Sequence, residues 1–223
     1  MVSILTKLII ARHGNTFNPD DTPTRLGART DIPLVSKGRA QATALGHYLK
    51  EHDLMPDAVY CSSLMRTRQT AEIALQEMGS REHIYALDIF NEIDYGIDEN
   101  QSEDKVIERI GSEAIKNWDK NAIVPDGWKA NPDEIIQNWI GFSKQISKTH
   151  DEITNNVMDI SEVVLVVTSN GIARFAPHIT GKFEEFAQHY PIKLSTGAIG
   201  ILEFNQEKWR VIDWNIKPTI KNI

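Results

Sequence analysis

Two short apolar runs, each ending abruptly in polar residues, constrain the fold most. Residues 8–11 read Leu-Ile-Ile-Ala before Arg-His-Gly, and residues 163–167 read Val-Val-Leu-Val-Val before Thr-Ser-Asn-Gly. Apolar runs of roughly four to eight residues with turn residues behind them are typical of strands buried in a parallel sheet. Open α/β sheets bind ligands at the carboxyl ends of such strands. We therefore predict buried parallel strands here, with chemistry at their carboxyl ends.

The remaining segments predict an alternation of helices and strands. Apolar residues recur at helical spacing from Ser36, a plausible N-cap, and a second helix over residues 64–78 has Ser62 or Ser63 as its cap. Further expected elements are strands over residues 58–61 and 84–87, a helix from Ile172, and a hairpin over 197–204 and 209–214. This order predicts an α/β three-layer sandwich, with a mostly parallel central sheet and helices on both faces.

The length of the chain favours one domain over residues 1–223. A segment at about residues 99–158 lacks a strand pattern and carries apolar and aromatic residues at helical spacing. We expect two or three helices in this insertion, with the apolar stripe in the core; a lid or substrate wall is the alternative.

The charge and cysteine content narrow the class of protein. A net charge of −7 without a cluster of Lys and Arg argues against nucleic acid as a partner, so any phosphate must be bound by a few focused residues. The single Cys61 excludes an internal disulfide and fits a small core residue in a reducing compartment. We expect no signal peptide and no membrane span, and hence a cytoplasmic protein.

Arg12, His13 and Gly14 follow the first apolar run and are the first candidate site. Arginine offers a fixed fork of donors to phosphate or carboxylate, histidine is a nucleophile or a base, and glycine allows close backbone approach. Arg66, in the first turn of a predicted helix, combines its donors with the helix dipole, which suits a phosphoryl group. The alternative is a surface turn and a solvated arginine.

The stretch Arg12-His13-Gly14, followed by the hydroxyl residue Thr16, resembles the signature of the histidine phosphatase superfamily, the phosphoglycerate-mutase-like proteins. This resemblance implies a phosphoglycerate-mutase-like fold and a phosphohistidine at His13. Residues 61–71 are similar to the second signature of the family, in which Arg66 matches a phosphate-binding arginine. Arg68 does not match and is interpreted as a surface residue.

Residues 87–96 resemble the family segment that carries an acid/base glutamate. Asn91-Glu92 and Tyr95-Gly96 match the pattern of the cofactor-dependent mutases, which implies Glu92 as the general acid. Asp88 and Asp94 compete for this role, and the alternative for Glu92 is a solvated loop acid.

Ser169 stands where the family has its second histidine. A serine hydroxyl can donate one neutral hydrogen bond but brings no positive charge, so we expect weakened rather than abolished catalysis. Asn170 and the amides of the following helix are expected to compensate in part. We therefore assign phosphate binding to Arg12, Arg66, Ser169 and Asn170.

The resemblance implies a phosphomonoesterase that acts on a small phosphorylated metabolite without metal or cofactor. His13 attacks phosphorus, Glu92 protonates the leaving group, and water cleaves the intermediate. Candidate substrate contacts in the loop over residues 17–31 are Asn18, Arg25 and Arg29.

Two other functions remain open. A cofactor-dependent phosphoglycerate mutase fits the residues around Glu92, and a non-catalytic phosphate-binding or regulatory protein fits the loss of the second histidine. No sequence feature indicates an oligomeric state or the identity of the substrate.

Overall fold

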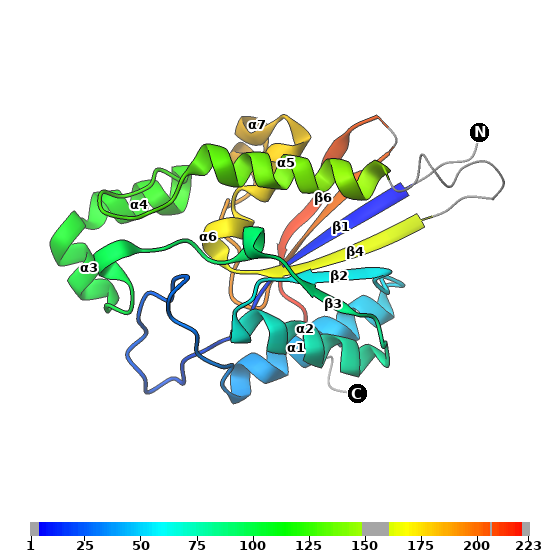
Figure 1. Cartoon of the computed structure of the whole chain (residues 1–223), viewed down its shortest axis with the longest axis horizontal. Helices are drawn as coiled ribbons and strands as arrows, with labels where there is room; N and C mark the ends of the chain where they lie inside the picture. The colour runs from blue at the N-terminus through cyan, green and yellow to red at the C-terminus, as the bar shows by residue number, and fades with distance from the viewer. Residues whose placement is uncertain (1–4, 149–160, 206, 220–223) are drawn as a thin grey trace.

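The computed structural model describes residues 5–148, 161–205 and 207–219 (Figure 1). Its centre is a six-stranded sheet in the order β3-β2-β4-β1-β5-β6. The strands are β1 (Leu5–Arg12), β2 (Ala58–Cys61), β3 (Ile84–Ala86), β4 (Ser161–Thr168), β5 (Ile199–Phe204) and β6 (Trp209–Ile216). Strands β1 to β4 are parallel, whereas β5 is antiparallel to both β1 and β6. The prediction of a mostly parallel sheet is therefore confirmed.

The two apolar runs that led the sequence analysis lie side by side in the middle of this sheet. Strand β1 pairs with β4 in a register that places Leu8 opposite Val164 and Arg12 opposite Thr168. The carboxyl ends of both strands lie side by side, so the polar residues that follow each strand are brought together.

Helices cover both faces of the sheet, as predicted. The helices are α1 (Ser36–Glu51), α2 (Met65–Met78), α3 (Glu103–Ile110), α4 (Ser112–Asn121), α5 (Pro132–Lys148), α6 (Asn170–Ala173) and α7 (Phe183–His189). Figure 1 shows α1 and α2 on one face, α5 and α7 on the other, and α3 and α4 beyond the sheet. The expectation of a single domain over residues 1–223 stays a prediction.

Each face of the sheet has its own apolar core. Ile9 and Ala11 point into the core that α1 and α2 cover, whereas Leu8 and Ile10 point into the opposite one. Aromatic residues of the insertion fill this second core, among them Trp118, Trp139 and Phe142. The interpretation of the aromatic stripe as core is confirmed, and three helices lie in the described part of the insertion. Its predicted end, residues 149–158, lies outside the described residues.

Several expected helix starts are wrong in detail. Val35, not Ser36, is the N-cap of α1, and Leu64 is the N-cap of α2. The amide of Met65 is satisfied by Asp31 Oδ1 at 2.6 Å, an acceptor that is distant in the sequence and so replaces a local cap. 

The helix expected from Ile172 is α6, which begins at Asn170 and has only four residues. A 3-10 helix with Pro177 in its first turn follows, because proline has no N–H to continue an α-helix but fits a helix start.

Two further expectations concern Cys61 and membranes. Cys61 is a free, buried cysteine, and burial raises the pKa of its thiol to about 11, as befits an unreactive core residue. Among the described residues, no helix has the length and apolar character needed to cross a bilayer.

Candidate active site

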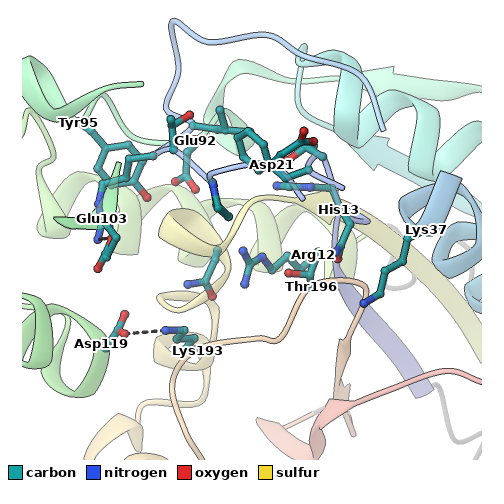
Figure 2. Close-up of a pocket in the computed structure, with 18 of the residues that line it drawn as sticks. Arg12, His13, Asp21, Lys37, Glu92, Tyr95, Glu103, Asp119, Lys193 and Thr196 are labelled. Carbon is teal, nitrogen blue, oxygen red and sulfur yellow. Dashed lines mark hydrogen bonds and ion pairs between the residues drawn. The ribbon is translucent and has the colours of Figure 1, made fainter. Parts of the chain in front are cut away.

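A cavity of about 610 Å³ opens where the carboxyl ends of β1 and β4 meet. It is lined by side chains from the end of β1, the loop after it, the segment around Glu92, the end of α4, helix α6 and the loop before β5. Figure 2 shows Arg12, His13 and Lys37 on one side, and Glu103, Asp119 and Lys193 on the other. We call the side of the cavity with Arg12, His13 and Lys37 the near end, and the side with Glu103, Asp119 and Lys193 the far end.

His13 lies directly after β1, and its backbone is fixed from two directions. Its amide donates to the carbonyl of Thr168 at 3.1 Å, which extends the pairing of β1 with β4. A Cβ added at Gly14 would lie 2.3 Å from the carbonyl oxygen of Gly38, so only glycine allows the start of α1 to approach this closely. The histidine therefore stands on a turn that is held by backbone contacts.

The imidazole of His13 is held in one neutral tautomer. Its Nδ1 lies 2.8 Å from the carbonyl oxygen of Gly14, and because a carbonyl can only accept, Nδ1 carries the proton. The lone pair is then on Nε2. Burial, and after it the charges of Arg66 and Arg12, lower the pKa of His13 well below its ordinary value. The ring is therefore uncharged at neutral pH, as nucleophilic attack requires.

Arg12 brings a half-buried positive charge to the near end. Its Nη1 donates to the carbonyl of Leu194 at 2.8 Å, but its buried Nε has no hydrogen-bond partner in the described part of the chain. Within residues 5–148, 161–205 and 207–219, no carboxylate forms an ion pair with it. A guanidinium without an ion-pair partner is suited to an anionic group.

Arg66 lies behind the near end rather than on its wall. It is wholly buried and is not among the lining residues. Its Nη1 donates to the carbonyl of Thr30 at 2.7 Å and its Nη2 to that of Gly27 at 3.3 Å, so it anchors the loop over residues 17–31. Its buried Nε has no partner among the described residues. Its charge still reaches the site, since it helps to lower the pKa of His13.

Glu92 is the one of the three competing acids that lines the cavity. Its Oε2 accepts the amide of Gly171 at 3.1 Å, and its Oε1 accepts its neighbour's amide, that of Ile93, at 2.9 Å. A Cβ at Gly171 would lie 2.0 Å from Oε1, so a side chain there would displace the Glu92 carboxylate. Asp88 is exposed, and Asp94 is held outside the cavity by Arg29.

Of the neighbouring residues Ser169 and Asn170, only Asn170 lines the cavity. Ser169 is wholly buried, does not line the cavity, and its Oγ has no partner among the residues described. Asn170 does line the cavity, and its Oδ1 accepts the amide of Leu194 at 3.0 Å. Asn170 thereby fixes the same loop that Arg12 contacts.

Two of the three expected substrate contacts line the cavity, and one does not. Asn18 and Arg25 line the cavity. Arg29 does not: it forms ion pairs with Asp94 at 3.1 Å and Glu99 at 3.3 Å in a separate surface hollow. These two carboxylates hold the guanidinium of Arg29 away from the cavity, and a substrate contact at Arg29 stays a prediction.

Sequence reasoning missed the charged residues of the far end. Arg174 is buried. It lines the cavity together with Glu103, Asp119 and Lys193. The one available signal was the position of Arg174, four residues after Asn170 and thus one helical turn on. Arg68 is exposed, as expected.

Within the described residues, no group of three or more His, Cys, Asp or Glu side chains is placed to hold a metal ion. Of the described histidines, only His13 lines the cavity.

Comparison with known proteins identifies the family. The model of the histidine phosphatase superfamily (branch 1) matches residues 8–217. The chain is 25% identical over 212 residues to the uncharacterized phosphatase PhoE of Bacillus subtilis (strain 168), covering 95% of each protein. It is 26% identical to a 2,3-bisphosphoglycerate-dependent phosphoglycerate mutase of Bartonella bacilliformis, covering 90% of this chain and 93% of the mutase.

A solved structure shares the fold. The mycobacterial glucosyl-3-phosphoglycerate phosphatase superposes with a TM-score of 0.74 at 16% identity, covering 95% of this chain and 99% of that one. The site geometry and the match over residues 8–217 lead to one conclusion: this chain belongs to the histidine phosphatase superfamily, branch 1, whose fold and enzyme class it shares.

Proposed function

We propose that this protein is a phosphomonoesterase that works through a phosphohistidine on His13. The observation that carries the proposal is the state of His13: a neutral, buried ring with its Nδ1 proton held by Gly14, beside the unpaired guanidinium of Arg12. The similarity to a phosphatase over 95% of the chain supports the same activity.

The first step transfers the phosphoryl group to the enzyme. Nε2 of His13 attacks phosphorus while the bond from phosphorus to the leaving oxygen breaks, and the carboxyl group of Glu92 gives its proton to that oxygen. Arg12 lies where it can bind the phosphoryl oxygens as their charge is redistributed, a contribution of about 3 kcal/mol for a single preorganised donor. Arg66 adds positive potential from behind.

The second step regenerates the enzyme. The carboxylate of Glu92 takes a proton from water, the water oxygen attacks phosphorus, and the bond from phosphorus to Nε2 breaks. Phosphate leaves, and Glu92 is again protonated for the next cycle. Asn170 lines the cavity and is the proposed substitute for part of the missing histidine, whereas Ser169 does not line it.

A trapping experiment tests this proposal. The protein is mixed with a ³²P-labelled phosphomonoester and quenched, and phosphohistidine is identified as an acid-labile, alkali-stable label with released phosphate followed in parallel. We expect label on Nε2 in the wild type and none in His13→Ala. His189→Ala is the matched control, because His189 is exposed and lies outside the cavity.

The outcomes separate the three functions. Label with phosphate release supports the phosphatase. Conversion of 3-phosphoglycerate to 2-phosphoglycerate in the presence of 2,3-bisphosphoglycerate would instead identify a mutase, which the similarity to the Bartonella bacilliformis enzyme makes worth testing. Binding of phosphomonoesters without label, release or isomerisation would leave a non-catalytic binding protein.

A further inference from the structure

The far end of the cavity indicates which phosphomonoesters fit. We propose that the site selects substrates whose leaving group carries no second negative charge and is rich in hydroxyl groups, as in a phosphorylated polyol or sugar. This inference rests on the proposed function, because it concerns the same cavity.

The cations of the far end already have carboxylate partners. Lys193 Nζ lies 2.6 Å from Asp119 Oδ2, and Nη2 of Arg174 lies 3.8 Å from the other oxygen of that carboxylate. The first of these pairs is drawn in Figure 2. Arg25 Nη2 lies 2.5 Å from Glu103 Oε2. A second anion on the substrate would therefore meet cations whose charge is compensated.

The donors of Arg174 are also committed to the protein. Its Nε donates to the carbonyl of Asn170 at 3.2 Å and its Nη1 to that of Trp118 at 2.5 Å. Its guanidinium carbon lies 3.9 Å from the ring centroid of Trp118. Burial lowers the pKa of Arg174 to about 10, yet the group stays protonated at neutral pH. Arg174 therefore shapes the wall and holds its charge in place.

Arg25 is fixed in a similar way. Its guanidinium carbon lies 4.7 Å from the ring centroid of Trp128 and 5.4 Å from that of Tyr95, so two aromatic rings hold it beside Glu103. A ligand anion that paired with Arg25 would have to compete with this carboxylate.

The paired charges disfavour an anion and favour hydroxyl groups. A carboxylate or second phosphate at the far end would lie beside Asp119 or Glu103 and would be repelled by these carboxylates. A hydroxyl group can donate to a carboxylate and accept from Lys193 without breaking either pair. The chemistry of the far end is therefore that of a neutral, hydrogen-bonding leaving group.

A matched pair of ligands tests the inference. D-glucitol 6-phosphate and 6-phospho-D-gluconate differ only at C1, where one has a hydroxymethyl group and the other a carboxylate. Dissociation constants are measured by calorimetry in His13→Ala, which cannot form the phosphohistidine and so does not consume the ligands. We expect glucitol 6-phosphate to bind about tenfold more tightly.

A second variant tests the cause of this preference. Asp119→Asn, added to His13→Ala, removes the charge that compensates Lys193 and Arg174, and we expect the preference to fall at least threefold, an effect of roughly this order for a partly exposed pair. Asp133→Asn is the matched control, since Asp133 is exposed and does not line the cavity. Circular dichroism checks that each variant is folded.

Equal or tighter binding of 6-phospho-D-gluconate would overturn the inference, whether or not Asp119→Asn folds. An unchanged preference in folded Asp119→Asn would overturn the assigned cause. Because these are binding measurements, they decide the inference independently of the phosphohistidine trap, which decides the proposed function.

Discussion

The two ends of the cavity differ in whether their cationic side chains are paired with carboxylates. At the near end, Arg12 is half-buried and forms no ion pair with a carboxylate of the described residues, whereas at the far end Asp119 and Glu103 pair with Arg174, Lys193 and Arg25. An uncompensated buried charge costs stability, and a compensated one costs less. The near end thus keeps a positive charge without an ion-pair partner, as the proposed binding of a transferred phosphoryl group requires.

The largest expected effect comes from exchanging the two kinds of arginine for methionine. Arg12→Met should lower kcat/KM by about 10³-fold while changing the free energy of unfolding by less than about 1 kcal/mol, because removal of the unpaired charge offsets the lost hydrogen bond to Leu194. Arg174→Met should instead lower that free energy by about 2 kcal/mol, because Asp119 and two carbonyl groups lose a partner. Urea unfolding and initial rates measure both quantities. Equal losses in the free energy of unfolding for the two variants would contradict the difference between the two ends of the cavity.

The next effect concerns the position of Glu92. Gly171→Ala should lower kcat about 100-fold, because the added methyl group would overlap Glu92 Oε1 and move the proton donor. Gly141→Ala is the control, since a Cβ there meets nothing within 4 Å. If Gly171→Ala kept full activity with an alkyl phosphate such as D-glucitol 6-phosphate, whose leaving oxygen needs a proton, the assignment of Glu92 would be wrong.

The near end should also affect stability as pH changes. The pKa of His13 is lowered on folding, so between its folded value and the ordinary value of 6.5 the unfolded chain binds more protons. Stability should therefore fall as pH drops below 6.5, with a slope of at most about 1.4 kcal/mol per pH unit from this group. Urea titrations across the range in which histidine titrates, about pH 5 to 8, should show a shallower decline in His13→Gln. An identical decline would contradict the burial of an uncharged ring.

The smallest effect separates two arginines of one loop. Arg25→Ala should lower kcat/KM about tenfold because it removes part of the cavity wall and leaves Glu103 uncompensated. Arg29→Ala should change it less than about twofold, since Arg29 is half exposed, lies outside the cavity, and forms ion pairs of the surface type. Comparable losses of kcat/KM in both variants would show that Arg29 also contacts the substrate.

The near end was largely predictable and the far end was not. Arg12, His13 and Glu92 lie in short local motifs, and the apolar runs before two of the polar stretches predicted the central strands correctly. The far end depends on contacts between distant segments: Lys193 and Asp119 are 74 positions apart. No local period or spacing encodes such a pair.

The same reason explains the errors. Asp31 caps α2 from 34 positions away, in place of the serines that a local pattern favours. Arg29 lies in the same loop as Arg25, and only the positions of Asp94 and Glu99, set by the fold, decide that one lines the cavity and the other does not.

The close approach of Gly14 and Gly38 has a consequence for how this site can vary. A Cβ at Gly38 would lie 2.1 Å from the carbonyl oxygen of Asn15, and one at Gly14 would meet the backbone of Gly38. Main chain touches main chain here, so no rearrangement of side chains can make room for a substitution. In a library of single variants selected for activity, these two positions should tolerate glycine alone, while the walls around them diversify toward new substrates.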